Sequence, residues 1–309
     1  MSKRETYESA PILITGAQGQ VGLALTRTLQ GLAPIVAIDR AELDLTDTDA
    51  VRRVVREIRP SAIINAAAYT AVDRAETDEQ AAQCINGEVP GVLAEEAKRL
   101  DALLIHYSTD YVFDGHGDAP FHEDDPTGPL NAYGRTKLAG EQAVAAVDGE
   151  YLVLRTSWVY GMTGKNFLLT MLRLARERDE LAVVDDQIGA PTWSETIAVL
   201  SAHILARYMA ERTTRRIQHD WWHAHRGVYH LTNGGETSWC GFARAIFQMS
   251  GANVTVKPIA TQAYPTPAQR PHNSRLSSEK LATVFGLRAP TWRDALELCL
   301  QGQRSEAAH

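Results

Sequence analysis

The stretch that decides the fold is Pro11-Ile-Leu-Ile-Thr-Gly16-Ala-Gln-Gly19-Gln-Val-Gly22, near the N-terminus. Its apolar start predicts a buried strand, and its three glycines at three-residue spacing predict a tight turn that leads into a helix. Glycines let a pyrophosphate approach the backbone closely, and the helix N-terminus offers free N–H groups to an anion. The stretch therefore predicts a dinucleotide-binding turn; the alternative is a turn with only a structural role.

The residues that would choose the cofactor follow the next predicted strand, at 35–38. Asp39 comes about 20 residues after the turn, where a carboxylate can bind a ribose hydroxyl. Arg40 comes directly afterwards, and an arginine at this place can accept the 2′-phosphate of NADP. Because Asp39 favours NADH and Arg40 favours NADPH, both cofactors stay open.

Strands and helices alternate through the first 155 residues. Short β-branched runs predict strands at 12–14, 35–38, 62–65, 103–108 and 151–154. Apolar residues at helical spacing predict helices at 19–29, 51–58, 90–100 and 133–147. Such alternation is typical of stacked βαβ units, so we expect an α/β protein with a Rossmann-type, doubly wound parallel sheet.

The pattern loosens after residue 155, which predicts two parts. We expect an NAD(P)-binding domain at 1–155 and a smaller, mainly substrate-binding C-terminal lobe at 156–309. Helices are expected in this lobe near 167–178, 194–209, 239–249 and 291–300, with short strands and Pro-rich turns between them. The short apolar run at 228–231 is expected to return to the main sheet as a further strand.

Composition and charge exclude several classes of protein. The chain has 309 residues, of which 44% are hydrophobic and 22% charged, as in an ordinary globular protein. No apolar run approaches the roughly 18 residues of a membrane helix, and residues 1–10 show no signal-peptide core, so we expect a cytoplasmic protein without a membrane partner. The net charge of -7 argues against nucleic-acid binding. Cys84, Cys240 and Cys299 are too far apart for a Cys-x-x-Cys metal site.

Tyr133-Gly-Arg-Thr-Lys137 places a tyrosine and a lysine on one face at the start of a predicted helix. A phenol, with a pKa near about 10, is a poor proton donor near neutral pH until an ammonium stabilises its phenolate, which gives the lysine a chemical role. Thr109, at the end of the preceding strand, can hydrogen-bond a substrate oxygen. The three residues predict a proton-transfer site; the alternative is an exposed helix N-terminus with ordinary polar residues.

Several motifs together resemble the extended short-chain dehydrogenase/reductase superfamily: the glycine turn, the Asn65-Ala-Ala-Ala68 run after the third strand, and the Thr109, Tyr133 and Lys137 set. Longer segments resemble, more specifically, the dTDP-4-dehydrorhamnose reductase family. They are NAAAYTAVD at 65–73, STDYVFDG at 108–115, LRTSWVY at 154–160, VDDQIGAPT at 184–192, YHL at 229–231 and RPHNSRL at 270–276. The resemblance covers nearly the whole chain.

The resemblance implies a role for each matching position. It makes Tyr133 the proton donor, Lys137 the partner that lowers the tyrosine pKa and binds the ribose, and Thr109 the hydrogen-bonding group at the reacting carbonyl. The cofactor-binding residues expected from the turn and the resemblance are Gly16, Gly19, Gln20, Val21, Gly22, Asp39, Arg40, Asp44, Leu45, Ala67, Ala68, Tyr69, Tyr133 and Lys137. The implied substrate-binding residues are Val72, Asp73, Asp110, Tyr111 and Trp158. For Trp158, packing in an aromatic core is the alternative.

Two positions depart from the family's pattern. Some relatives form a metal-bridged dimer through a glutamate two residues after the third glycine. This chain has Ala24 there, so we expect no metal site and leave other kinds of homodimer open. Gly87 follows Asn86 where superfamily members often carry a larger residue, which weakens the assignment of that loop to cofactor contact. The histidine-rich segment 219–225 has no third ligand at metal-site spacing.

The resemblance implies reduction of the 4-keto group of dTDP-4-dehydro-6-deoxy-L-mannose (dTDP-4-dehydro-L-rhamnose) to dTDP-L-rhamnose by NADPH or NADH. The nucleotide sugar is then the expected small-molecule partner. Two alternatives stay open: a 4-ketoreductase that makes another nucleotide deoxysugar, and a non-catalytic, dinucleotide-binding regulatory subunit. The complete set of Thr109, Tyr133 and Lys137 favours catalysis.

Overall fold

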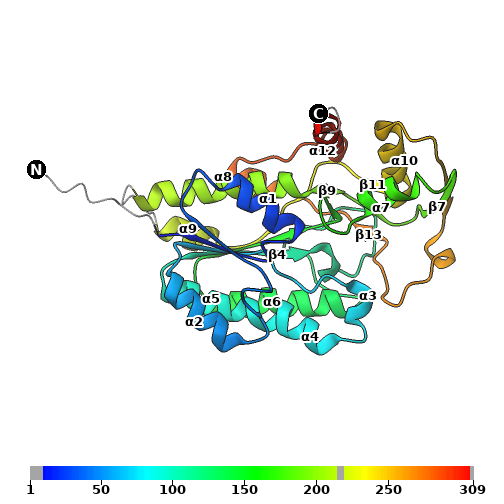
Figure 1. The fold of residues 1–309 in the computed structure, drawn as a ribbon. Helices are drawn as coiled ribbons and strands as arrows, with labels where there is room; N and C mark the ends of the chain where they lie inside the picture. Colours follow the sequence, from blue (N-terminus) through cyan, green and yellow to red (C-terminus); the bar gives the residue numbers. More distant parts are fainter. Residues whose placement is uncertain (1–9, 214–218, 307–309) are drawn as a thin grey trace, which may run out of the picture.

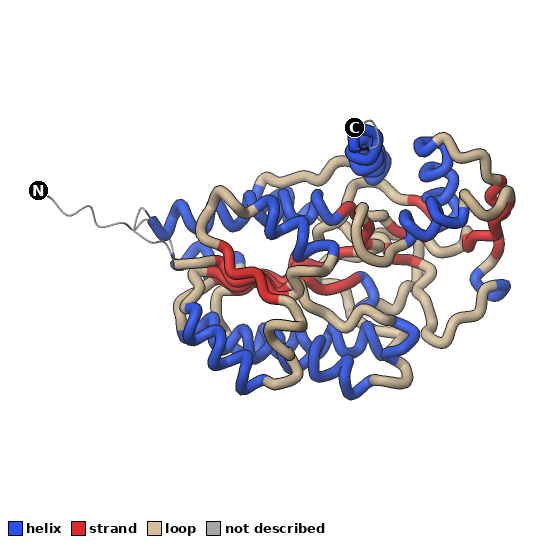
Figure 2. The backbone as a smooth tube through the Cα atoms, viewed as in Figure 1, coloured by secondary structure: helices blue, strands red, loops and turns tan. Residues whose placement is uncertain are grey.

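A six-stranded parallel sheet forms the centre of the computed structural model, which describes residues 10–213 and 219–306 (Figure 1, Figure 2). Its strands are β1 (Ile12–Thr15), β2 (Ile35–Ile38), β3 (Ala62–Asn65), β4 (Leu103–Thr109), β5 (Tyr151–Thr156) and β10 (Gly227–His230). They lie in the order β10-β5-β4-β3-β1-β2, and every neighbouring pair is parallel. This doubly wound order confirms the expected fold, and the direction of winding changes between β1 and β3.

Helices cover both faces of the sheet (Figure 1). On one face lie α1 (Gln20–Thr28), α8 (Ser194–Thr213) and α9 (His219–His225), and on the other α2 (Thr48–Ile58), α5 (Val89–Arg99) and α6 (Ala132–Val147). Ile12 and Ile14 of β1 belong to the core under α1 and α8, whereas Leu13 belongs to the core under α2 and α5. Successive strand residues thus serve opposite layers, which explains the continuous apolar run of this strand.

A second lobe lies beside the sheet, at the right of Figure 1. It contains α7 (Phe167–Leu174), α10 (Trp239–Ser250), α12 (Trp292–Glu306) and the strand pairs β7 (Glu180–Val184) with β12 (Thr255–Ile259) and β6 (Val159–Tyr160) with β9 (Thr192–Trp193). A three-stranded sheet joins β8 (Ile188–Gly189) to β11 (Thr237–Ser238) and β13 (Asn273–Ser274). The second lobe has a hydrophobic core of its own, which includes Leu168, Phe242 and Leu296.

Short elements complete the chain and were not expected from the sequence. They are α3 (Val72–Ala75), α4 (Glu79–Gln83), a π-helical turn η1 (Cys84–Glu88), the 3₁₀ turns η2 (Asp110–Val112) and η3 (Thr261–Ala263), and α11 (Glu279–Phe285). Elements of this length carry too few residues for hydrophobic periodicity to show them. The helix expected at 167–178 ends at Leu174, where the Arg176 backbone N–H turns back to the Arg173 carbonyl. In the described ranges, no helix has both the length and the apolar character that crossing a membrane requires.

Candidate active site

The glycine turn closes against the end of β3, at the point where the winding direction changes. Gly16 has a φ of 71°, in the left-handed region that favours glycine. A Cβ on Gly16 would lie 2.6 Å from the Ala67 backbone nitrogen, and a Cβ on Gly22 would lie 2.1 Å from the Gly16 carbonyl oxygen. The turn itself therefore needs both of these glycines. At Gly19 a Cβ would lie 3.2 Å from the Gly16 carbonyl oxygen, which is tight but less severe.

A cavity of about 560 Å³ adjoins this turn, a volume within the usual range for ligand sites. The residues expected to bind the cofactor that line it are Gly16, Gly19, Gln20, Val21, Asp39, Arg40, Asp44, Leu45, Ala67, Ala68, Tyr69, Tyr133 and Lys137. Gly22 lies outside the lining because it packs on Gly16. A cavity that runs from the glycine turn and Asp39 to Tyr133 fits a dinucleotide. Its wall also contains residues that sequence reasoning missed, including Ile85, Ser108, Thr156 and Lys165.

Acidic and basic side chains meet at the Asp39 end of the cavity. One oxygen of Asp39, Oδ1, accepts hydrogen bonds from the backbone N–H of Ala41 at 2.7 Å and of Glu42 at 3.3 Å. Arg40 is exposed beside it. Asp44 accepts hydrogen bonds from the backbone and the hydroxyl of the threonine two residues on, and these bonds lower the pKa of Asp44. The structure thus keeps a carboxylate and a guanidinium together at this end.

Tyr133 and Lys137 lie one turn apart on α6, next to the end of β4. The helix begins after Asn131, whose Oδ1 accepts a hydrogen bond from the Gly134 backbone N–H at 2.8 Å. Thr109 is the last residue of β4, and its hydroxyl donates to Asp110 Oδ1 at 3.0 Å. A side-chain hydrogen bond between Thr109 and Tyr133 also acts on the tyrosine pKa. The structure therefore brings the three predicted catalytic residues together.

Burial moves the pKa values of the tyrosine and the lysine in opposite directions. It raises the pKa of Tyr133 to about 12, although the Thr109 hydrogen bond lowers it. It lowers the pKa of Lys137 to about 8. Lys137 is 2% exposed, and its Nζ donates to the Tyr107 carbonyl oxygen at 2.6 Å and lies 3.3 Å from His106 Nε2. Both of these partners of Lys137 belong to β4, and neither is Tyr133. The expected lowering of the Tyr133 pKa by Lys137 therefore stays a prediction.

The residues expected to bind the substrate lie beside the cofactor cavity rather than in its lining. Asp110 is buried, and among the described residues its Oδ2 finds no hydrogen-bond partner. Tyr111 meets the Tyr133 ring edge-on, with 5.7 Å between the ring centroids. Trp158 has a φ of 47° and stacks on Trp239 with the ring centroids 3.6 Å apart. Left-handed backbone in a non-glycine residue is strained and clusters at functional sites.

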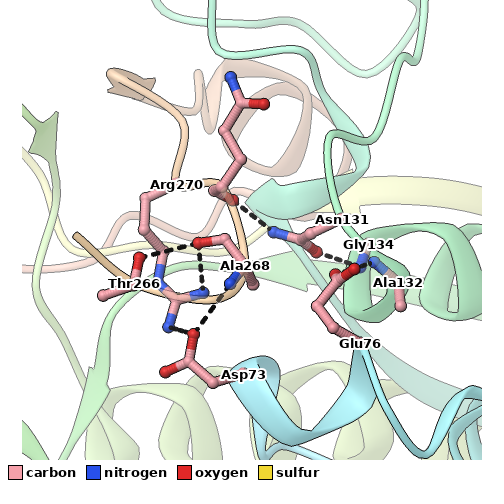
Figure 3. A network of polar contacts seen from close by, with 9 residues as sticks. Asp73, Glu76, Asn131, Ala132, Gly134, Thr266, Ala268 and Arg270 are labelled. Atoms are coloured by element: carbon pink, nitrogen blue, oxygen red, sulfur yellow. Dashed lines mark hydrogen bonds and ion pairs between the residues drawn. The ribbon is translucent and has the colours of Figure 1, made fainter.

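Val72 and Asp73 begin α3, and Asp73 attaches a distant loop to the site (Figure 3). Asp73 Oδ1 accepts a hydrogen bond from Arg270 at 2.9 Å and one from the Ala268 backbone N–H at 3.2 Å. The amide of Asn131 donates to the carbonyl of the intervening residue at 2.8 Å. These contacts hold loop 266–270 against α3 and the start of α6. Burial raises the pKa of Tyr111, and the positive charge of Arg270 lies close enough to oppose this rise in part.

Sequence reasoning missed Asn86, which shapes the cofactor cavity. Its Oδ1 accepts a hydrogen bond from the Tyr69 backbone N–H at 2.8 Å, and its Nδ2 donates to the Tyr69 carbonyl and to the Thr136 hydroxyl, both at 3.1 Å. Asn86 therefore ties the cavity wall at Tyr69 to α6. It lies in the π-helical turn η1, a feature frequent at functional sites but without a local sequence signal.

The position of the glutamate found in some relatives faces the interior of this chain. Ala24 is 2% exposed and belongs to the core between α1, α8 and the sheet. Within residues 10–213 and 219–306, no three His, Cys, Asp or Glu side chains come together in a group that could hold a metal ion.

The fold and the site define a dinucleotide-dependent oxidoreductase of the short-chain dehydrogenase/reductase type. The family model described as the RmlD substrate binding domain matches residues 10–305. The chain is 50% identical over 303 residues to a dTDP-4-dehydrorhamnose reductase of Burkholderia thailandensis, covering 96% of this chain and 99% of that protein. The Escherichia coli enzyme of the same name is 44% identical over 292 residues, covering 91% and 94%.

Solved structures agree with these relatives. The dTDP-4-dehydrorhamnose reductase of Clostridium acetobutylicum superposes with a TM-score of 0.86 at 37% identity and covers 95% of this chain and 99% of that one. The Bacillus anthracis enzyme, solved in complex with NADP, gives a TM-score of 0.86 at 36% identity with the same coverage. This chain belongs to the dTDP-4-dehydrorhamnose reductase family.

Proposed function

We propose that this enzyme reduces the 4-keto group of dTDP-4-dehydro-L-rhamnose to dTDP-L-rhamnose with NADPH or NADH. The cavity that connects the glycine turn to Tyr133 and Lys137 carries the proposal. When bound there, the nicotinamide supplies the hydride, which is chemistry that no side chain can perform. The residues that would hold the cofactor are those of the cavity lining, from Gly16 and Asp39 to Lys137.

Tyr133 is the proton donor in this proposal. With its pKa raised to about 12, the phenol is protonated at neutral pH and has a proton to give to the C4 oxygen. In the substrate complex the Thr109 hydroxyl, at the end of β4, turns from Asp110 and donates its hydrogen bond to the same oxygen. Lys137 places an ammonium one helical turn away, and this charge favours the phenolate that Tyr133 becomes.

The sugar nucleotide lies on the side of Tyr133 formed by the second lobe. Trp158 packs against the sugar, and Asp110 and Tyr111 orient its hydroxyl groups, while Val72 and Asp73 form the neighbouring wall. The protein as a whole carries a net charge of -7, so the diphosphate needs a local cation. We assign this role to Arg270, which its contact with Asp73 holds beside the site.

We assign cofactor binding to residues 1–155 together with β10, and substrate binding mainly to residues 156–309. Most of the cavity lining follows the ends of β1 to β4, which supports this division, although Thr156, Val159, Gly164 and Lys165 of the second part also line the cavity. Trp158 and loop 266–270 lie outside the lining and come from the second part. A cytoplasmic location and a homodimer stay predictions.

Incubation of the purified protein with NADPH or NADH and a panel of nucleotide 4-keto-6-deoxysugars tests this function. The expected product from dTDP-4-dehydro-L-rhamnose is dTDP-L-rhamnose, identified by NMR. A different epimer at C4 would assign the enzyme to another 4-ketoreductase. Cofactor binding without oxidation by any member of the panel would favour a regulatory subunit.

A further inference from the structure

A row of four buried polar side chains leads from the glycine turn to Lys137. The Thr15 hydroxyl donates to Asn65 Oδ1 at 2.7 Å, Asn65 Nδ2 lies 3.0 Å from His106 Nδ1, and His106 Nε2 lies 3.3 Å from Lys137 Nζ. The first three are register partners across β1, β3 and β4, and none of the four is more than 2% exposed. The role of Lys137 alone does not explain this row.

The donors and acceptors of the row couple its two ends. Because an amide nitrogen only donates, His106 Nδ1 accepts from Asn65, and the neutral ring then carries its hydrogen on Nε2. That N–H can donate a hydrogen bond to the nitrogen of a neutral Lys137 amine. When the Asn65 amide turns over, its oxygen accepts from His106 Nδ1–H, its nitrogen donates to Thr15, and Nε2 becomes the acceptor that the Lys137 ammonium requires.

We propose that His106 is a positioning residue for Lys137, and that the hydrogen-bond directions along the row of Thr15, Asn65 and His106 reverse when this lysine gains or loses its proton. The inference rests on the proposed function, in which the ammonium supports proton donation by Tyr133. Burial and the nearby Lys137 charge hold the pKa of His106 well below its ordinary value, so the ring stays neutral. It provides the ammonium with an acceptor in addition to the Tyr107 carbonyl oxygen.

The other titratable groups around Lys137 already have partners of their own. On α6, Glu141 raises the pKa of Lys137, but it is held by Arg155 of β5 at 2.7 Å and accepts a hydrogen bond from Ser108 at 2.5 Å. The Tyr107 hydroxyl of β4 shares a hydrogen bond of 2.7 Å with Ser201 of α8. Tyr133, also on α6, has its pKa raised by burial and keeps its proton near neutral pH. Of these groups, His106 is therefore the one that can change from hydrogen-bond donor to acceptor toward Lys137.

The pH dependence of NADPH binding, measured by fluorescence titration without sugar nucleotide, tests the inference. His106→Leu removes a partner of both forms of Lys137, but the charge-assisted hydrogen bond from the ammonium is the stronger of the two. The alkaline loss of NADPH affinity should therefore move down by about one pH unit, a tenfold change in proton affinity. His106→Gln, whose amide can reach the position of Nε2, should restore most of the shift. In the pH profile of kcat, the fall on the alkaline side should also move to lower pH in His106→Leu.

His230→Leu is the matched control, because His230 is a fully buried histidine of β10, the edge strand of the same sheet. It should lower stability without moving the alkaline loss of NADPH affinity. If His106→Leu does not fold, His106→Asn replaces it, since its amide matches Nδ1 but is too short to reach Lys137, and the same shift is expected. If a folded variant loses NADPH affinity at the same alkaline pH as wild type, the inference is overturned. The binding titration needs no substrate, so an inactive wild type would refute the proposed function separately.

Discussion

Replacing Asp110 with asparagine tests the electrostatics of the substrate side. Burial raises the pKa of this 3% exposed carboxyl from 3.8 to about 6. About two units correspond to about 3 kcal/mol, at about 1.36 kcal/mol per unit. The unfolded chain ionises Asp110 near pH 4, whereas the folded chain keeps the proton until about pH 6. Its stability contribution is therefore complete below about pH 4 and is lost as the pH rises through about 6.

Asparagine has the shape of the protonated acid and does not ionise, so Asp110→Asn avoids this loss. In urea denaturation the variant should gain about 3 kcal/mol over wild type at pH 8, and about half of that at pH 5. Asp124→Asn is the control, because Asp124 is exposed, and it should change stability little at either pH. A gain that is equal at both pH values, or a loss at pH 8, would refute the argument.

Three further substitutions test the cofactor side and the core. Gly19→Val should leave the fold intact, because Gly19 has an ordinary extended backbone with a φ of -73° and the Gly16 carbonyl oxygen, 3.2 Å from the added Cβ, need move only a little, but it should abolish NADPH binding in a fluorescence titration; unchanged affinity would remove the assignment. Wild type should use NADPH and NADH within about tenfold, and Arg40→Ala should weaken only NADPH in steady-state kinetics; an equal loss for both would show that Arg40 does not contact the 2′-phosphate. Arg155→Met should cost about 3 to 5 kcal/mol in urea denaturation, because it leaves Glu141 buried without its ion pair, and a loss below about 1 kcal/mol would contradict this.

Most of the residues that line the cavity could be predicted from local sequence, because they follow the ends of single strands or lie at the start of single helices. The glycine turn follows β1, Asp39 follows β2, and Tyr133 lies in the first turn of α6. A short motif and the single strand or helix beside it are therefore enough to place each of them. Gly22 shows the limit of this reasoning: the motif names it with the others, but its contact is with Gly16 and not with the cavity.

The remaining parts depend on contacts between residues far apart in the chain. Arg270 meets Asp73 across 197 positions, and no spacing rule connects them. His106 lies inside an apolar strand, where a buried histidine has no local pattern, and only the register of β3 and β4 places Asn65 beside it. Trp158 was expected at the site, but its strained backbone and its stacking on Trp239 require the second lobe.

Single-turnover oxidation of bound NADPH, followed by absorbance with dTDP-4-dehydro-L-rhamnose present, tests the central claim most directly when wild type is compared with Tyr133→Phe. Phenylalanine keeps the ring that packs against Tyr111 and removes only the hydroxyl that we propose as the proton donor. The rate should fall by about 10² to 10⁴, with NADPH affinity retained. Equal rates for wild type and variant would contradict the assignment of Tyr133 as the proton donor.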